Sequence, residues 1–317
     1  MELTVDSQLA TPSAYFLNKR RAIELGHIAS WGRKGQTRIH PESEWLFRAA
    51  IRSFLDFTGL YERGRRNALS PVISSTELAF PNLPPSFDGF CILHLSDIHG
   101  DCIEGFAAQV APLLRGLEAD LCVMTGDYRF EIDGPCDAVY PVMEAIVGAV
   151  SARHGVAGIL GNHDSIEMVR PLERLGVRML LNQNWEIRRG DDSLWLLGVD
   201  DPHYYGCDDL IGACSAVPDD AFRILLAHSP EIVEEAEACG VHLYFCGHTH
   251  GGQICLPGLG PLFLNATCRR KFTRGHWRFA QMQGYTNRGL GSSGVPVRYN
   301  CPPEIALVTL RRGERAA

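Results

Sequence analysis

The stretch Cys91-Ile-Leu-His-Leu-Ser-Asp-Ile-His99 joins a short apolar run to two side chains that bind metal ions. Residues 91–95 predict a buried β-strand, and Asp97 and His99 follow directly after its end. Carboxylate oxygen and imidazole nitrogen are ligands that divalent metals prefer. Two residues two apart on an extended chain share one face, so both can point at one ion. The pattern predicts a core strand that ends at a metal site.

Four further stretches place similar side chains after apolar runs of strand length. They are Gly126-Asp127 after residues 121–125, Gly161-Asn162-His163-Asp164 after 155–160, His228 after 222–227, and Gly247-His248-Thr249-His250 after 243–246. A single polar residue at a strand end is more often a core or capping residue. Five stretches in this order, with their glycines in place, are not expected by chance. The candidate metal ligands are Asp97, His99, Asp127, Asn162, His228, His248 and His250.

Such a ligand set suits a pair of divalent ions. Two ions ~3.5–4 Å apart can hold a phosphoryl group and generate a hydroxide nucleophile at neutral pH. Asp127, in the middle of the set, can bridge two ions through its two oxygens. His163 follows Asn162 but points to the opposite side of an extended chain, which suits a general acid or charge stabiliser at the leaving-group oxygen. Asp164 can orient it.

The order of elements predicts a layered α/β fold with two sheets face to face and helices outside. Between the strands, apolar periodicity predicts helices over residues 103–117, 138–150, 168–175 and 231–238. Further strands are expected at 185–188, 194–199 and 305–310, and residues 251–310 should be antiparallel strands and loops. We expect a catalytic domain over residues 89–312, preceded by an N-terminal extension over residues 1–88.

The extension carries a predicted amphipathic helix over residues 41–61, followed by Arg63, Arg65 and Arg66. One interpretation is a helix lying on an anionic membrane surface. The alternative, which we favour, is that its apolar face packs on the catalytic domain. Residues 70–88 are rich in Pro and Ser and are typical of a linker or strap.

Composition narrows the possible partners and location. The chain has 317 residues, 45% hydrophobic and 21% charged, which is ordinary for a globular protein. The net charge of −7 argues against a general nucleic-acid binder. Eleven cysteines without a C-x-x-C pair suggest reduced core residues. No signal-peptide core and no apolar stretch of spanning length is seen, so we expect a cytoplasmic protein, peripheral at most at the inner face of the membrane. The composition does not predict an oligomeric state.

The series Asp-x-His, Gly-Asp, Gly-Asn-His-Asp, His and Gly-His-x-His, over about residues 92–250, resembles that of the calcineurin-like metallophosphoesterases. The resemblance implies a four-layer α/β/β/α sandwich of two mixed sheets, with a dinuclear Mn, Fe, Zn or Mg site, Mn being favoured. By position, it implies one metal held by Asp97, His99, Asp127 and His250. It implies a second metal held by Asp127, Asn162, His228 and His248, and it makes His163 the catalytic histidine.

One departure from the family pattern bears on activity. The phosphoprotein phosphatases of the family carry Gly-Asp-x-x-Asp-Arg-Gly, whereas Phe130 stands here where an acid would steady the catalytic histidine. Protein-phosphatase activity is therefore not expected, and the orienting partner of His163 is left open.

Flanking sequences resemble one branch of the family, namely residues 197–202, 247–254 and 288–305. That branch contains a bacterial UDP-2,3-diacylglucosamine pyrophosphatase of lipid A synthesis and several phosphodiesterases. It implies hydrolysis of a phosphodiester or pyrophosphate, with a lipid-linked nucleotide sugar as the favoured substrate. The alternatives are a broad phosphodiesterase acting on nucleotides or glycerophosphodiesters, and a non-catalytic metal-binding scaffold, which the complete ligand set disfavours.

Other polar segments have two interpretations each. Arg269, Arg270 and Arg274 suit a clamp on a diphosphate, or equally a solvated charged hairpin. Residues 200–203, with two aspartates and a histidine, either border the site or form a polar turn. Residues 289–294 match G-x-G-x-x-G but precede Val-Pro rather than a helix, so we reject a dinucleotide site and expect a glycine-rich loop beside the active site.

Overall fold

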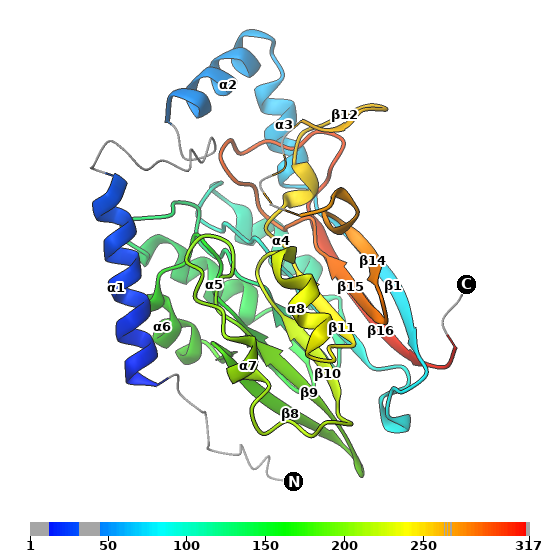
Figure 1. The fold of residues 1–317 in the computed structure, drawn as a ribbon. Helices are drawn as coiled ribbons and strands as arrows, with labels where there is room; N and C mark the ends of the chain where they lie inside the picture. The colour runs from blue at the N-terminus through cyan, green and yellow to red at the C-terminus, as the bar shows by residue number, and fades with distance from the viewer. Residues whose placement is uncertain (1–12, 32–44, 263, 265, 267, 315–317) are drawn as a thin grey trace.

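The computed structural model describes residues 13–314 except 32–44, 263, 265 and 267. Two six-stranded mixed sheets lie at its centre (Figure 1). The first has the order β1 (Val72–Phe80), β16 (Glu304–Arg312), β2 (Cys91–Leu95), β4 (Leu121–Met124), β6 (Val156–Gly158), β7 (Val177–Met179). The second has the order β14 (Gly275–Phe279), β15 (Met282–Thr286), β11 (Leu243–Cys246), β10 (Phe222–Leu226), β9 (Asp192–Gly198), β8 (Gln183–Arg189).

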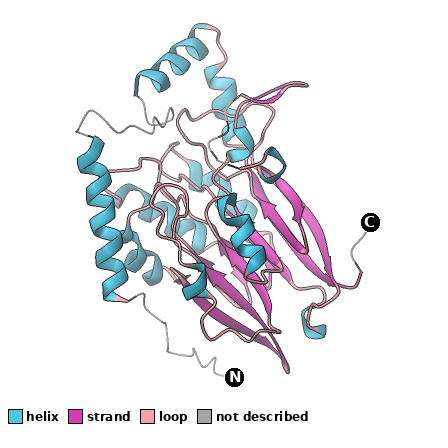
Figure 2. Cartoon of the chain, viewed as in Figure 1, coloured by secondary structure: helices cyan, strands magenta, loops and turns pink. Residues whose placement is uncertain are grey.

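Helices lie outside the sheets (Figure 2). They are α1 (Ala14–Trp31), α2 (Trp45–Phe57), α3 (Tyr61–Ala68), α4 (Phe106–Arg115), α5 (Tyr140–Val147), α6 (Val169–Arg174), α7 (Leu210–Ala213) and α8 (Val233–Ala238). Two small sheets pair β3 (Glu118–Ala119) with β5 (Ser151–Ala152), and β12 (Cys255–Leu256) with β13 (Gly260–Pro261). Among the described residues, no helix combines the length and apolar character needed to cross a membrane.

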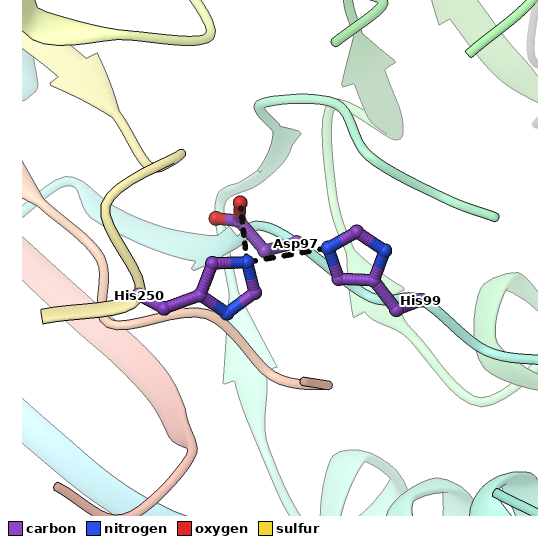
Figure 3. Close-up of side chains that lie close together, drawn as sticks. All are labelled: Asp97, His99 and His250. Atoms are coloured by element: carbon purple, nitrogen blue, oxygen red, sulfur yellow. Dashed lines mark hydrogen bonds and ion pairs between the residues drawn. The ribbon is translucent and has the colours of Figure 1, made fainter. Parts of the chain in front are cut away.

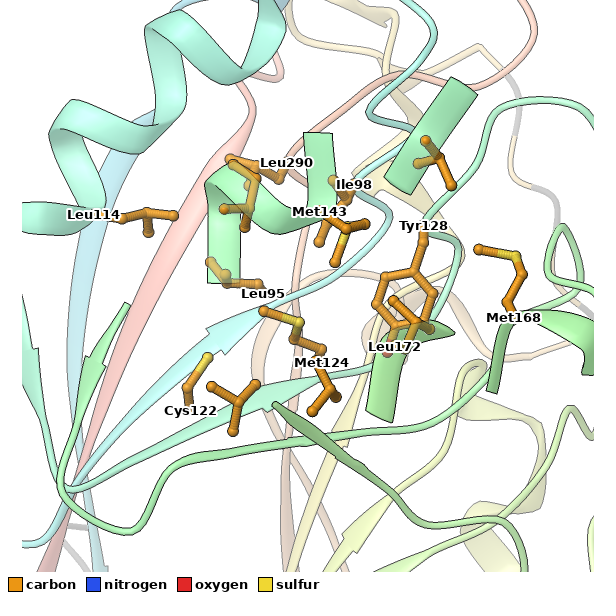
Figure 4. Close-up of a cluster of buried hydrophobic side chains, with 14 of the residues drawn as sticks. Leu95, Ile98, Leu114, Cys122, Met124, Tyr128, Met143, Met168, Leu172 and Leu290 are labelled. Carbon is orange, nitrogen blue, oxygen red and sulfur yellow. The ribbon is translucent and has the colours of Figure 1, made fainter. Parts of the chain in front are cut away.

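Alternation along the strands separates three cores. Ile92 of β2 lies in the core between the sheets, whereas Leu93 packs in the core under α4, α5 and α6 (Figure 4). In the second sheet Ile224 faces the central core, whereas Leu225 faces outward in the core shared with α7 and α8. The layers are therefore helix, sheet, sheet and helix, which confirms the predicted four-layer α/β/β/α sandwich.

Parallel pairing brings the ligand-bearing loops together. Strands β2, β4 and β6 run parallel in the first sheet, and β9, β10 and β11 run parallel in the second. The carboxyl ends of parallel strands meet at one edge of a sheet. All five ligand stretches follow such ends, and the strands predicted at 91–95 and 243–246 have those bounds.

The N-terminal part differs from expectation in three ways. The helix predicted over 41–61 ends early, at Phe57 of α2, where Gly59 follows with a left-handed φ of 69°, and a separate helix, α3, begins at Tyr61; residues 41–44 lie outside the described part. The linker interpretation of residues 70–88 is wrong over β1, which pairs in parallel with β16 along its whole length. Helix α1 was not predicted. The division into domains at residue 88 stays a prediction.

Candidate active site

Five of the predicted ligands have an unusual backbone conformation. Asp97, His99, Asp127, His248 and His250 have φ values of 48°, 40°, 57°, 68° and 50°. Residues other than glycine rarely adopt this left-handed region, and each such backbone conformation costs about 1–3 kcal/mol. The expected geometry of two side chains on one extended face is therefore wrong. These residues sit on tight turns after the strands.

Asp97, His99 and His250 form the first group of ligand atoms, and their side chains point toward one another in Figure 3. Nε2 of His250 lies 3.3 Å from Oδ1 of Asp97 and 3.2 Å from Nε2 of His99. All three side chains are buried. Their ligand atoms lie within 4.8 Å of one another, close enough to surround one cation.

Asp127, His228 and His248 form a second group, with Asn162 beside it. Nε2 of His228 lies 3.3 Å from Oδ2 of Asp127, 3.2 Å from Nδ1 of His248 and 3.0 Å from Oδ1 of Asn162. His248 and His250 thus belong to different groups, although only one residue separates them. The structure brings together all seven predicted ligands.

His163 joins the two groups from one side. Its Nε2 lies 4.0 Å from Oδ2 of Asp127, and its ring centroid lies 4.7 Å from that of His99. Its Nδ1 lies 2.5 Å from the backbone oxygen of Phe130, which can only accept a hydrogen bond. The main chain at Phe130 therefore orients His163, and Nε2 is the nitrogen presented to the centre.

Asp164 does not have the expected role of orienting His163. Its carboxylate accepts the backbone N–H groups of Asp127, Tyr128 and Gly161 at 2.7, 2.8 and 2.9 Å. It therefore ties the loop after β4 to the loop after β6. Burial and the nearby charge of Asp127 raise the pKa of Asp164 to about 7.

The donor atoms fit divalent cations. Nδ1 of His99 donates to the backbone oxygen of Arg129 at 2.8 Å, and Nδ1 of His228 donates to that of Thr125 at 2.7 Å. A carbonyl partner fixes the ring tautomer and leaves the Nε2 lone pair directed at the centre. Facing lone pairs beside buried carboxylates repel one another, and a cation between them removes that repulsion. These clusters could hold divalent metal ions.

Burial is the largest single influence on the pKa values of the buried groups in the site. It lowers the pKa of His99 to about 3 and raises the pKa of Asp97 to about 6. Burial also acts to lower the pKa of His228, but the charge of Asp127, its hydrogen bond to His228 and the charge of Asp97 together raise that pKa to about 10. A metal ion that binds Nε2 of His228 must therefore compete with a proton for that atom.

The glycine-rich loop lies beside the site, as predicted. The backbone N–H groups of Leu290 and Gly291 donate to the backbone oxygens of Ser96 and Asp97 at 2.8 and 2.7 Å. Behind it, the fully buried Arg298 has Nη2 3.1 Å from Nδ1 of His250. Sequence reasoning gave Arg298 no role, because an arginine near a chain end usually reads as surface charge.

Of the two other polar segments considered from the sequence, one lies beside the site and the other makes no described contact with it. His203 borders the site, since its ring centroid lies 4.2 Å from that of His248, and its Nδ1 contacts Glu231 at 2.8 Å. Arg269, Arg270 and Arg274 are exposed, and among the described residues no hydrogen bond or ion pair joins them to a predicted ligand. Their role as a clamp stays a prediction.

Comparison with known proteins agrees with this geometry. Residues 91–252 match the family described as calcineurin-like phosphoesterase. The chain is 31% identical to the uncharacterized metallophosphoesterase YkuE of Bacillus subtilis, over 76% of this chain and 86% of that protein. It is 28% identical to the phosphodiesterase YaeI of Escherichia coli, over 70% and 82%. It is 30% identical to a bovine transmembrane protein with metallophosphoesterase domain, over 77% and 58%.

A solved NAD nucleotidase of Haemophilus influenzae overlays with a TM-score of 0.40 and 13% identity, covering 63% of this chain and 45% of that one. A likeness so distant adds nothing to the assignment. The sequence matches show that this chain belongs to the calcineurin-like phosphoesterase family. It is a metal-dependent phosphoesterase, and therefore a hydrolase.

Proposed function

We propose that this protein hydrolyses a phosphodiester or pyrophosphate with two divalent ions, of which Mn²⁺ is favoured. The position of Asp127 carries the proposal, because its Oδ2 lies 3.7 Å from Nε2 of His99 and 3.3 Å from Nε2 of His228. One carboxylate thus stands between the two groups. The proposed ligands are Asp97, His99, Asp127 and His250 at one ion, and Asp127, Asn162, His228 and His248 at the other.

When bound, such ions polarise the phosphoryl oxygens and supply a nucleophile at neutral pH. The protein positions the reacting groups around them. Nε2 of His163 faces the centre and can deliver a proton to the leaving-group oxygen, while its Nδ1 stays bonded to Phe130. The bridging carboxylate of Asp127 is itself fixed, because its Oδ1 accepts the backbone N–H of His163 at 2.8 Å.

Metal removal and one substitution test this proposal. Chelated protein should lose activity and regain it with Mn²⁺, with about two ions per chain. Asp127→Asn should lose metal and activity together, whereas the fully exposed Asp219→Asn should change neither. Full activity of Asp127→Asn on every substrate that the wild type cleaves would refute the two-metal mechanism. Less than one ion per chain, with no hydrolysis, would favour the scaffold.

For the substrate, we propose a lipid-linked nucleotide such as UDP-2,3-diacylglucosamine, with lipid A synthesis as the setting. Its support is the similarity of the flanking segments to one family branch, together with exposed arginines that can meet a diphosphate. One metal-loaded preparation should be assayed on this compound, cyclic nucleotides and simple diesters. Activity on the diesters alone would favour the broad phosphodiesterase. Replacing Arg269, Arg270 and Arg274 should raise KM for the nucleotide substrate only.

We also propose a cytoplasmic location with contact at the membrane surface through α2. Leu55 of this helix packs with Tyr61 and Val297, but Phe54 and Phe57, which belong to the predicted apolar face, are 63% and 91% exposed. These two residues therefore do not pack on the catalytic domain, contrary to the favoured alternative. Beside it, the β12–β13 hairpin carries Leu259, which is 76% exposed. Figure 1 places α2, α3 and β12 at one end of the molecule.

The charge around this surface suits an anionic lipid layer. Arg63 and Arg66 of α3, the helix that follows α2 in the chain, are exposed, and basic residues near an apolar helix face favour anionic membranes. Helix α2 also contacts a loop of the active site, because its Arg48 forms two hydrogen bonds with Glu131 at 2.9 and 3.1 Å, next to Phe130. A surface docked there would therefore lie near the catalytic loops.

Co-sedimentation with anionic liposomes at low salt tests the membrane proposal without any activity measurement. The wild type should bind, and the double variant Phe54→Ser, Phe57→Ser should not. Ile211→Ser is the matched control, since Ile211 is 81% exposed on α7, away from α2 in Figure 1. Equal binding of wild type and double variant, or no binding of the wild type, would refute it.

A further inference from the structure

Helix α1 buries a charged residue on the catalytic layers. Phe16 and Leu17 pack on the core beneath the first sheet, and one helical turn later Arg20 is fully buried. A buried charge is costly unless ion pairs and hydrogen bonds compensate it. The partners of Arg20 therefore show what the helix is built to hold.

Arg20 joins two segments that are far apart in sequence. Its Nε donates to Oδ2 of Asp200 at 2.8 Å, its Nη1 contacts Glu24, and its Nη2 donates to the backbone oxygen of Asp164 at 3.3 Å. The guanidinium carbon lies 3.4 Å from the ring centroid of Tyr205. One side chain thus connects the loop after β6 with the turn after β9.

Both connected segments reach the proposed metal centre. On one side, Glu24 accepts the backbone N–H of Ile166 at 2.7 Å and the hydroxyl of Ser165 at 3.0 Å, so three consecutive residues after His163 are bonded to α1. On the other side, Asp200 begins the turn that carries His203, whose ring packs on His248.

We propose that Arg20 is a positioning residue that clamps the His163 loop to the turn packed on His248. It acts through Asp164 and Asp200 and does not touch the reacting atoms. The proposal rests on the proposed function for its effect on catalysis. Its structural effect on the two loops can be measured independently.

Three variants test the clamp. Arg20→Ala removes the guanidinium, and Arg20→Lys keeps the charge but cannot reach Asp200, Glu24 and Asp164 together. Arg21→Met is the matched control, because Arg21 is the next residue and pairs with Glu167 of the same region, but that pair is 58% and 60% exposed. An exposed pair contributes little.

Hydrogen exchange of the metal-free protein gives the readout that needs no activity. Arg20→Ala should exchange faster in peptides covering residues 161–167 and 199–206, while peptides of β10 and β11 keep their wild-type protection. Arg21→Met should match the wild type throughout. Unchanged exchange in both loops would overturn the clamp, as would uniform loss of protection across the whole chain in both Arg20 variants.

Kinetics on a soluble diester complete the test. A misplacement of about 1 Å can lower the rate ~100-fold, so kcat should fall ~10- to 100-fold in Arg20→Ala with little change in KM. Millimolar guanidinium should partly restore kcat in this variant alone. If Arg20→Ala does not fold, Arg20→Lys carries both measurements. An inactive wild type would refute the proposed function and leave the exchange result to decide the clamp.

Discussion

Gly161 offers a direct test of how tightly the proposed bridging ligand is held. It has an ordinary backbone conformation, but a β-carbon added there would lie 2.2 Å from Oδ1 of Asp127, 2.6 Å from the backbone nitrogen of Asp127 and 2.8 Å from Cε1 of His228. Normal contact begins near 3.4 Å, so the Asp127 carboxylate would have to move by about 1 Å. A shift of that size costs ~10²-fold in rate, or about 2.7 kcal/mol of transition-state stabilisation.

The assay is kcat/KM of Gly161→Ala on a soluble diester in Mn²⁺, with metal content measured on the same sample. Gly105→Ala is the control, because it strains the backbone without causing a clash: Gly105 has a φ of 81°, and nothing lies within 4 Å of the added carbon. It should lose about 1–2 kcal/mol of stability and keep its activity. Activity of Gly161→Ala within threefold of wild type, at full metal content, would refute the proposed role of Asp127.

Three further outcomes are expected. His163→Asn should lower kcat ~10²- to 10⁴-fold on substrates with poor leaving groups, and less on p-nitrophenyl esters, which need no proton. Burial lowers the pKa of His94 to about 3. As the pH falls, the imidazole is therefore protonated in the unfolded chain before it is protonated in the folded protein. The free energy of unfolding of the metal-free protein, measured by urea titration, should therefore fall by about 1.4 kcal/mol for each pH unit below about pH 6.5, relative to that of His94→Gln. Glu304→Gln should destabilise the fold by about 3 kcal/mol in the same titration, because buried Glu304 bonds to Arg288 at 3.1 and 3.2 Å.

The sequence was sufficient to predict the core strands and to pick out polar residues that the structure brings together, for one physical reason. A buried strand must be an apolar run, and a ligand placed after it interrupts that run with a polar side chain. Both signals therefore mark the same boundary, as at Leu95 and Asp97. The prediction of element bounds was weaker at Gly59, where a single left-handed glycine ends α2 before the predicted bound.

Other features could not be predicted because their stabilising contacts are non-local. The buried face of α1 carries Arg20 and Glu24, which hide the apolar periodicity of a packed helix. Strand β1 has exposed and half-buried residues over most of its length, so only its pairing with β16 reveals it as a strand. The left-handed conformations at the predicted ligands could not be foreseen either, because they stay uncommon even for aspartate and histidine, which adopt them more often than most residues.

The short segment 125–130 explains how this site can do without an acid at Phe130. Its backbone oxygens at Thr125, Arg129 and Phe130 hold the rings of His228, His99 and His163. The segment also carries Asp127, which stands between the two groups. A main-chain carbonyl orients a histidine whatever the side chain is, so the aromatic residue removes no essential contact. Arg129 then locks the segment, because its Nε donates to the backbone oxygen of His163 at 2.5 Å. The geometry of the centre therefore depends on the conformation of this loop more than on an acidic side chain at residue 130.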